Sequence, residues 1–431
     1  MRTYKLVVVS NRLPISVSKR DGKLHFEASS GGLATAMSTL DKKDRVWVGW
    51  PGIASDDLTP EEKQEITDEL VDHGCYPVFL TKEQVELFYE GYSNDTLWPL
   101  FHYFQSLAHQ KEAYWQTYIE VNKLFAASVK KVADATGSIW VHDYHLMILP
   151  QKLREILPDT SIGFFLHIPF PSFEIYRLLP QRKELLEGLL GADLIGFHIF
   201  DYARHFLSSC LRLLGVSNQQ GTLEYQGRTI KTDAYPIGID YKKFRDALNE
   251  PETKKAISSL EQNHKGIKII VSVDRLDYSK GIPQRLDAFK TLLETHPKWR
   301  GKVKLMMIAV PSRTEVGSYQ QLRDTIEQSV SRINGEYGTV DWTPISYQFQ
   351  NRPFHEVVAL YAAADVALVT PIRDGMNLVA KEYIASKHNR PGVLILSEMT
   401  GAIDELPEAL SINPLNTHSV AQAMNDALTM G

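Results

Sequence analysis

Short apolar runs alternate with amphipathic helical patterns along the whole chain, and this alternation constrains the fold more than any other feature. Strands buried on both faces of a parallel sheet appear as nearly continuous apolar runs, and helices carry the chain between them. In the first half, strands are predicted at Lys5–Ser10, Arg45–Trp50, Cys75–Leu80, Ser138–His142, Ile162–His167, Leu194–His198 and Thr232–Ile237. Helices are predicted at Leu33–Leu40, Thr59–His73, Glu83–Tyr89, Ala113–Ala135, Leu146–Ile156, Glu174–Leu178 and Tyr202–Leu214.

A second series of the same kind comes after a polar helical stretch at Tyr241–Lys265. Its predicted strands are Lys268–Val273, Lys304–Val310, Thr343–Tyr347, Val366–Thr370, Val393–Ser397 and the short Ala409–Asn413. Its predicted helices are Gln284–Thr295, Ser318–Ile333, Phe354–Ala364, Leu378–Ser386 and Ser419–Met430. The sequence therefore predicts an α/β protein of two domains, residues 1–240 and 241–431, with a ligand cleft between them.

Composition narrows the class of protein. A net charge of −5 over 431 residues gives no footprint for nucleic acid or for a membrane surface. The two cysteines, Cys75 and Cys210, have neither metal-type nor redox-type spacing, so we expect two unbridged thiols. The first apolar run is too short for the core of a signal peptide, and no run approaches the ~20 residues that span a bilayer. A cytoplasmic location is therefore expected.

The stretch from Leu368 to Glu382 is the strongest candidate for a ligand site. A buried strand breaks at a proline and a glycine, and a helix begins behind Asn377 as its predicted N-cap. Helix N-termini at the carboxyl ends of parallel strands point backbone N–H groups at anionic ligands. Asp374 and Glu382 add carboxylates there. A plain strand–turn–helix corner without a ligand is the alternative.

Two loops in the first half carry weaker signals. Arg12 stands at a strand end, where it suits phosphate recognition, although a surface ion pair is the simpler interpretation. Gly31 and Gly32 precede a predicted helix and would let a ligand approach the backbone. Neither the dinucleotide fingerprint nor a Walker A loop occurs, which disfavours a dehydrogenase.

Polar residues also end two central strands. Asp143 lies where a carboxylate can accept hydrogen bonds from sugar hydroxyls, and His167, followed by two prolines, is expected to face a cleft rather than the core. His142, Asp143 and His145 raise the question of a metal. Histidines three apart at a strand end do not face one site naturally, so we expect no metal there.

Cations gather in the loops of the second half. Arg275 and Lys280 share one short loop, and Arg313 comes after the next strand. A diphosphate requires such charges, and arginine adds bidentate geometry. No Asp-x-Asp motif is present to hold a metal at the diphosphate. We therefore expect arginine and lysine to neutralise it, with no metal and no cofactor.

Taken together, these motifs resemble the trehalose-6-phosphate synthase family, retaining glycosyltransferases of family 20 with two Rossmann-like domains facing a central cleft (the GT-B architecture). The resemblance runs from Leu6 to about Met430. The motifs that carry it are Ser10-Asn-Arg12, Gly31-Gly32, Tyr89, Leu97-Trp-Pro99, His142-Asp-Tyr-His145, His167-Ile-Pro-Phe-Pro171, Arg275-Leu-Asp-Tyr-Ser-Lys-Gly281 and Arg373-Asp-Gly-Met-Asn-Leu-Val-Ala-Lys-Glu382.

The resemblance implies transfer of glucose from UDP-glucose to glucose 6-phosphate, with retention and without a metal. It implies an acceptor-binding first domain, with the residues Arg12, Tyr89, Trp98, Asp143 and Arg313 at the acceptor. It implies a nucleotide-sugar-binding second domain, with donor contacts from Gly31, Gly32, Arg275, Lys280, Arg352, Met376, Asn377, Leu378, Val379, Ala380, Lys381 and Glu382. The residues nearest the reacting atoms would be His167, Arg275, Lys280 and Asp374. Arg352 departs from the family in side-chain type, and its expected contact to the base is through the main chain.

The resemblance and the charges together favour front-face attack, in which the leaving phosphate helps to deprotonate the acceptor hydroxyl. Arg275 and Lys280 would stabilise the charge that develops there. Domain closure would exclude water. The alternatives are a related transferase, such as a glucosylglycerol-phosphate synthase or a pseudo-glycosyltransferase, and a catalytically silent regulatory subunit. The sequence leaves open the nucleotide, the oligomeric state (a homo-oligomer is one option) and whether a further helix or a phosphatase domain continues the chain beyond residue 431.

Overall fold

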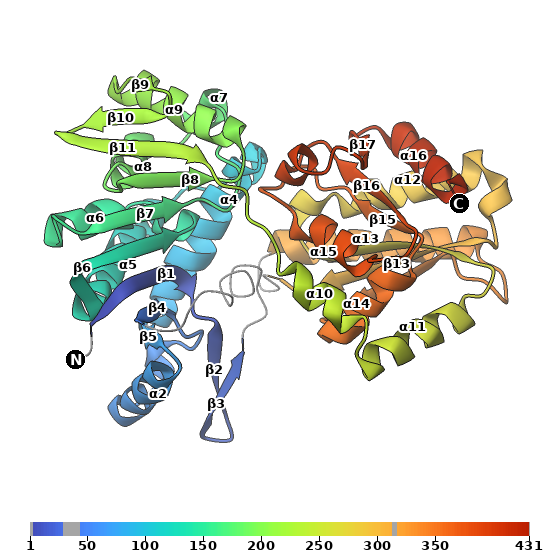
Figure 1. The fold of residues 1–431 in the computed structure, drawn as a ribbon, viewed down its shortest axis with the longest axis horizontal. Helices are drawn as coiled ribbons and strands as arrows, with labels where there is room; N and C mark the ends of the chain where they lie inside the picture. The colour runs from blue at the N-terminus through green and yellow to red at the C-terminus, as the bar shows by residue number, and fades with distance from the viewer. Residues whose placement is uncertain (1–2, 29–43, 313–316, 431) are drawn as a thin grey trace. The chain divides into compact units, whose positions relative to one another are not determined.

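The computed structural model describes residues 3–28, 44–312 and 317–430, and the chain divides into two compact units, Met1–Ile237 and Gly238–Gly431 (Figure 1). Each unit is built on its own large sheet. The predicted helix Leu33–Leu40 lies outside the described residues. No helix in the described part of the chain is long and apolar enough to cross a membrane.

The first unit is built on a nine-stranded sheet with the order β5-β4-β1-β6-β7-β8-β11-β10-β9. The strands from β5 to β11 run parallel, whereas β10 and β9 are antiparallel to their neighbours. A hairpin of β2 and β3 forms a separate two-stranded sheet. The strands are β1 (Tyr4–Arg12), β2 (Ile15–Arg20), β3 (Lys23–Ala28), β4 (Arg45–Trp50), β5 (Cys75–Pro77), β6 (Ala133–His142), β7 (Ser161–Phe165), β8 (Leu194–Phe197), β9 (Asn218–Gln219), β10 (Thr222–Tyr225) and β11 (Arg228–Ala234).

Helices connect these strands, and one of them is unusual. The segment η2 is a π-helix of 13 residues that continues directly from α3 and into α4. The described helices of this unit are η1 (Ser55–Asp57), α2 (Pro60–Asp72), α3 (Lys82–Gln84), η2 (Val85–Leu97), α4 (Trp98–Phe101), η3 (Gln105–Leu107), α5 (Glu112–Val132), η4 (Tyr144–Leu146), α6 (Leu149–Ile156), α7 (Phe173–Tyr176), α8 (Arg182–Leu189) and α9 (Phe200–Leu214).

The second unit is a six-stranded, fully parallel sheet with the order β14-β13-β12-β15-β16-β17. Its strands are β12 (Lys268–Arg275), β13 (Val303–Val310), β14 (Ile345–Phe349), β15 (Val366–Val369), β16 (Val393–Ser397) and β17 (Leu410–Ile412). Its helices are α10 (Tyr241–Ala247), α11 (Pro251–Asn263), η5 (Tyr278–Lys280), α12 (Ile282–Thr295), η6 (Pro297–Trp299), α13 (Gly317–Tyr337), α14 (Phe354–Ala363), α15 (Leu378–Ser386), η7 (Gly401–Asp404) and α16 (Thr417–Thr429).

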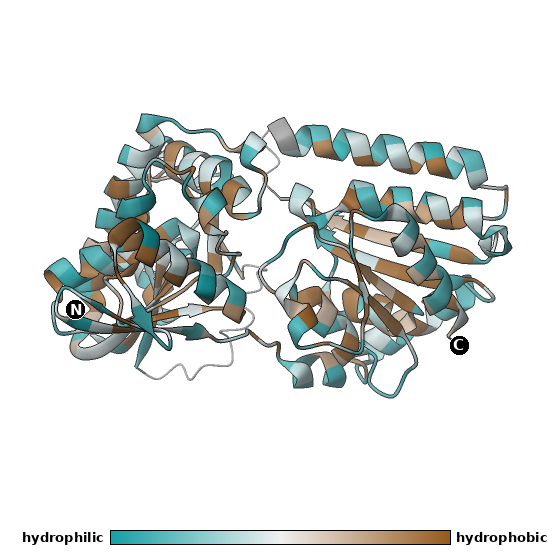
Figure 2. Cartoon of the chain, turned by 90° about the horizontal axis from the view of Figure 1, so that it is seen from above, coloured by the Kyte–Doolittle hydropathy of each residue, from teal (hydrophilic) through white to brown (hydrophobic). Residues whose placement is uncertain are grey.

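Each sheet is packed by apolar side chains. In the second unit, residues of β12, β13 and β15 pack with α12 and α16 in one core that contains Phe289, Leu368 and Met424. Figure 2 shows the corresponding pattern, with hydrophobic strands beneath helices that alternate hydrophobic and hydrophilic positions. This is the pattern expected of a doubly wound α/β unit.

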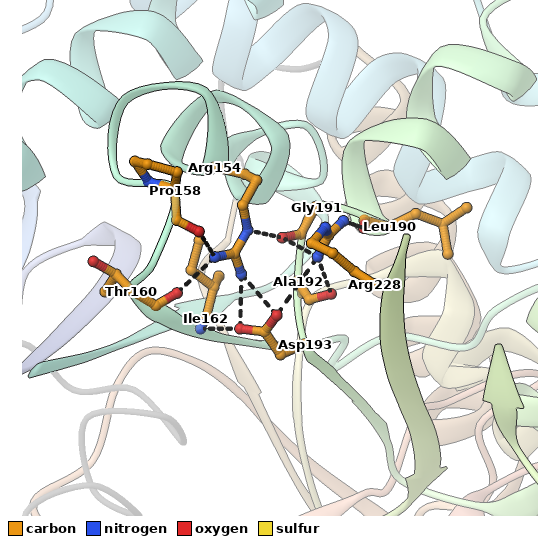
Figure 3. A network of polar contacts seen from close by, with 9 residues as sticks. All are labelled: Arg154, Pro158, Thr160, Ile162, Leu190, Gly191, Ala192, Asp193 and Arg228. Carbon is orange, nitrogen blue, oxygen red and sulfur yellow. Dashed lines mark hydrogen bonds and ion pairs between the residues drawn. The ribbon is translucent and has the colours of Figure 1, made fainter. Parts of the chain in front are cut away.

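A polar network closes the amino ends of β7 and β8 in the first unit (Figure 3). Arg154 donates to both carboxylate oxygens of Asp193, at 2.8 and 2.7 Å, and Ile162 N–H donates to the same carboxylate at 2.8 Å. Arg228 adds an ion pair to Asp193 at 3.5 Å. Since these groups satisfy one another, this edge serves stability, and ligand chemistry belongs at the opposite, carboxyl edge.

The prediction of two α/β halves with parallel sheets is confirmed, with local differences. The chain ends the first sheet with antiparallel strands, and the expected helix at Tyr241–Lys265 is two helices, α10 and α11. Pro251 explains the break, because proline is favoured at the first turn of a helix and disfavoured in its interior. Cys75 and Cys210 are both buried and are not bridged to each other.

Candidate active site

Arg12 ends β1 at the carboxyl edge of the first sheet, and its surroundings hold it in one place. Its Cζ lies 4.6 Å from the centre of the Trp50 ring, a cation–π contact. Gly52, at a φ of +95°, passes so close that a Cβ there would lie 2.7 Å from Nη2 of Arg12. Desolvation lowers the pKa of Arg12, while Tyr89 acts in the opposite direction. The guanidinium remains charged and suits an anionic ligand.

Tyr89 and Trp98 are joined to Arg12 through a continuous set of aromatic rings. Tyr89 lies 6.2 Å from Trp50 and stacks on His145 at 5.7 Å, measured between ring centres. His145 contacts Tyr144 at 3.9 Å, and Tyr144 lies 5.6 Å from Trp98. The sequence-predicted acceptor residues Arg12, Tyr89 and Trp98 thus belong to one cluster within the first unit.

Asp143 and His167 meet at the ends of β6 and β7. Asp143 adopts a left-handed backbone with a φ of 75°, which is uncommon for a residue with a side chain. Its Oδ1 accepts a hydrogen bond from the backbone N–H of His167 at 3.2 Å, and its own N–H donates to the carbonyl of Phe165 at 2.8 Å. These bonds fix the two strand ends against each other.

The histidines around Asp143 do not converge on one point. His142 lies against His167, with Nδ1 and Nε2 3.0 Å apart, whereas His145 stacks on Tyr89. Within the ranges that the structure describes, no group of three His, Cys, Asp or Glu side chains is placed to hold a metal ion.

Lys280, Asp374 and Asn377 form a tight polar cluster in the second unit. Lys280 Nζ donates to Asp374 Oδ2 at 2.6 Å, and Asn377 Nδ2 donates to the same oxygen at 3.0 Å. Gly375 N–H donates to the other carboxylate oxygen at 3.0 Å. Asn377, at a φ of 65°, caps α15 by accepting from Ala380 N–H at 3.3 Å. The predicted N-cap is confirmed, and this loop is fixed before any ligand arrives.

The first turn of α15 carries the predicted donor residues from Leu378 to Glu382. Lys381 pairs with Glu405, and Tyr361 OH donates to Glu382 Oε2 at 3.3 Å. Desolvation raises the pKa of Glu382, partly offset by the bond from Tyr361. The helix N-terminus supplies backbone donors and a positive dipole end to an anion.

Sequence reasoning missed Arg285, which lies beneath this loop and is only 1% exposed. Its guanidinium pairs with Asp274 at 2.8 Å and donates from Nε to Thr370 Oγ1 at 2.9 Å. It also bonds Ser272, and Nη2 donates to the carbonyl of Lys280 at 3.1 Å. Arg285 therefore ties the ends of β12 and β15 to the backbone that carries Lys280. Its place in an amphipathic helix pattern gave no signal of burial.

Sequence reasoning also missed Trp50, which lies beneath Arg12, although the neighbouring glycines and proline indicate a loop at this strand end. Arg275 is the exposed last residue of β12, so the strand extends into the predicted loop. The Arg352 side chain donates to Gln348 at 2.9 Å and to Glu356 at 3.1 Å. It lines a cavity of about 610 Å³ whose described lining includes α11 and β14 residues but not Lys280. Three further predicted positions, Gly31, Gly32 and Arg313, lie outside the described residues.

Comparison with known sequences places this geometry in context. Residues 4–431 match the sequence model described as "Glycosyltransferase family 20". The chain is 49% identical over 433 residues to alpha,alpha-trehalose-phosphate synthase (UDP-forming) 1 of Aspergillus fumigatus, covering 99% of this chain and 84% of that protein.

Solved structures agree over the whole chain. A Burkholderia xenovorans alpha,alpha-trehalose-phosphate synthase (UDP-forming) in complex with glucose-6-phosphate aligns with a TM-score of 0.87 at 34% identity, covering 99% of this chain and 92% of that one. A structure described as trehalose-6-phosphate from E. coli bound with UDP-2-fluoro glucose aligns with a TM-score of 0.86 at 36% identity, covering 99% and 91%.

Proposed function

This chain belongs to glycosyltransferase family 20, and on that premise we propose that it transfers glucose from UDP-glucose to glucose 6-phosphate, forming alpha,alpha-trehalose 6-phosphate and UDP. The observation that carries the proposal is the cluster of Lys280, Asp374 and Asn377 at the N-terminus of α15. It combines a cation, a carboxylate and a helix N-terminus, which are the groups that a sugar and its diphosphate require.

Most of the donor contacts are assigned to the second unit. Arg275 and Lys280 neutralise the diphosphate, and the backbone from Met376 to Lys381 supplies N–H donors. Asp374 accepts hydrogen bonds from glucose hydroxyls, and Glu382 accepts them from the ribose. The nearby Tyr361 hydroxyl supports this role, because it orients the Glu382 carboxylate. Arg352 and the glycines Gly31 and Gly32 complete the proposed donor set.

Most of the acceptor contacts are assigned to the first unit. Arg12 and the phosphate of glucose 6-phosphate form the principal charge pair, with Arg313 as the second cation. Tyr89 and Trp98 supply apolar surface with polar tips, and Asp143 accepts from the sugar hydroxyls. The aromatic set that joins Arg12 to Trp98 supports a single acceptor site there.

The proposed mechanism retains the configuration of the transferred glucose and requires neither metal nor cofactor. The acceptor hydroxyl attacks from the face that the UDP leaves, and its proton passes to the departing phosphate. Arg275 and Lys280 stabilise the negative charge that develops on that phosphate. Groups of this kind contribute about 10²–10³ in kcat when they act on charge formed in the transition state.

The experiment is release of the nucleoside diphosphate over a grid of UDP-, ADP- and GDP-glucose with glucose 6-phosphate and glycerol 3-phosphate, repeated with a chelator. Product NMR reports the configuration. Lys280→Ala should lower kcat by about 10²–10³ with little change in KM for the acceptor. Lys290→Ala, whose lysine pairs with Glu336 on the surface of the same unit, is the control. Loss of turnover in chelator, or an unchanged kcat for Lys280→Ala, would contradict the mechanism. UDP binding without product would favour a silent regulatory subunit.

A further inference from the structure

Two histidine rings contact each other edge to edge where β6 and β7 end. His142 is 1% exposed, and its Nδ1 lies 3.0 Å from Nε2 of the half-buried His167. The second ring nitrogen of His142, Nε2, is shielded from solvent and has no hydrogen-bond partner among the described residues. His167 is therefore not an isolated side chain, because its proton positions depend on those of His142.

The unpaired nitrogen decides which histidine donates. A neutral imidazole has one N–H and one lone pair. If His167 donated from Nε2, the N–H of His142 would have to be on its own Nε2, where a buried donor would be left without an acceptor. If His142 donates from Nδ1, its Nε2 holds only a lone pair, and an unused acceptor is tolerated better than an orphaned N–H. The second arrangement is favoured, and it leaves the proton of His167 on Nδ1.

Both rings are neutral in this environment. Desolvation lowers the pKa of His167 to about 4, and desolvation together with His167 lowers the pKa of His142 well below its usual range. Both rings must be neutral for a tautomer to be defined, because a charged imidazolium carries a proton on each ring nitrogen and therefore has no tautomers. The backbone bond from His167 N–H to Asp143 Oδ1, at 3.2 Å, fixes the position of the residue that carries the second ring.

We propose that His142 is a positioning residue that fixes the Nδ1–H tautomer of His167, so that His167 presents an N–H donor to a hydroxyl oxygen of the sugar being transferred. The sugar part of this inference rests on the proposed function. The tautomer itself follows from the pair alone. In metal sites and catalytic triads the partner of one ring nitrogen sets the state of the other in the same manner.

Nitrogen NMR tests the tautomer on the intact wild-type protein. With histidine labelled at both ring nitrogens, protonated and unprotonated nitrogens resonate in separate regions, and the signals are assigned by comparison with His142→Asn and His167→Asn. The expected result at neutral pH is a proton on Nδ1 of both residues. A proton on Nε2 of His167 would overturn the proposal regardless of any activity measurement.

Kinetics tests the consequence. In His142→Asn the amide nitrogen replaces Nδ1 and keeps the donor, whereas His142→Leu removes it. Losing one well-oriented hydrogen bond to the transferred glucose should raise KM for UDP-glucose about tenfold in His142→Leu. The affinity for UDP should be unchanged, because UDP lacks the glucose. His142→Asn should stay within about threefold of wild type. His73→Leu, at an exposed histidine that caps the end of α2, is the control.

The outcomes distinguish the role of His142 from the activity of the whole site. Equal damage in the Asn and Leu variants, or a parallel loss of UDP affinity, would show that His142 acts only through packing and would overturn its positioning role. If the wild-type protein formed no product from UDP-glucose and glucose 6-phosphate, the proposed function would fall, while the NMR result would still decide the tautomer.

Discussion

Replacing Arg285 with methionine should destabilise the second unit strongly, because it leaves a buried carboxylate without its counterion. The side chains of Arg285 and Asp274 are 0% and 4% exposed and lie 2.8 Å apart. The variant also withdraws donors from Ser272, Thr370 and the carbonyl of Lys280. Methionine fills much of the same volume, so the loss reports the polar groups rather than a cavity.

The magnitude follows from this geometry. Breaking a buried ion pair by removing one partner costs about 3–5 kcal/mol. For a domain of this size class, each kcal/mol lowers Tm by about 2–4 °C, so a fall of roughly 6–20 °C is expected. Burial already raises the pKa of Asp274, against the opposing effect of Arg285. Without Arg285 that pKa rises further, and a carboxyl with a raised folded-state pKa loses stability as the pH rises from its unfolded-state pKa of about 3.9 towards the folded-state value. The loss in Arg285→Met should therefore grow as the pH is raised above about 4.

Urea and thermal unfolding, followed by circular dichroism, measure the change. Arg323→Met is the matched control, because its pair with Glu327 at 2.7 Å is on the surface and should contribute less than about 1 kcal/mol. The double variant with Asp274→Leu should recover at least about 2 kcal/mol relative to the sum of the single changes. A loss below about 1 kcal/mol for Arg285→Met, or strict additivity in the double variant, would refute the reasoning.

The first unit supports two further predictions. Gly52→Ala places a methyl group 2.7 Å from Nη2 of Arg12, so KM for glucose 6-phosphate should rise roughly tenfold or more while UDP affinity is kept. Gly22→Ala is the control, because Gly22 is also at positive φ but a Cβ there would have nothing within 4 Å. Equal effects of the two substitutions on KM would exclude displacement of Arg12 as the cause. His167 and His142 have lowered pKa values, for His167 from 6.5 to about 4, so the unfolded chain binds protons first as pH falls. As the pH falls below 6.5, stability should drop by at most about 1.4 kcal/mol per pH unit for each histidine, and for His167 this drop should end at about pH 4. A urea midpoint that stays constant from about pH 7 to about pH 5 would contradict this.

Much of the second unit could be predicted from sequence, because its strands are buried on both faces. The predicted bounds of Val393–Ser397 and Leu378–Ser386 coincide with β16 and α15. Uniform apolar runs and an Asn N-cap are local signals that do not depend on distant contacts. Lys280 and Asp374 were singled out separately, and the structure joins them.

Other features of the fold and of the site were not predicted from the sequence. The hairpin of β2 and β3 was missed although Asp21-Gly22, at φ values of 49° and 73°, is a strong hairpin signal. Arg285 could not be found in this way, since its burial depends on the ends of two strands that lie far apart in sequence. The π-helical hydrogen bonding of η2 has no sequence signature of comparable strength.

The π-helical winding of η2 determines which side chains lie on the same side of that helix. Tyr89 and Trp98 are nine positions apart. At 3.6 residues per turn they would point in opposite directions, whereas at roughly 4.4 residues per turn nine positions make about two full turns and the two side chains share one side. Deleting a single residue between them would leave eight positions, which fall short of two full turns at roughly 4.4 residues per turn, and would rotate one aromatic ring away from the other. The length of this segment therefore matters to the aromatic cluster as much as its composition does.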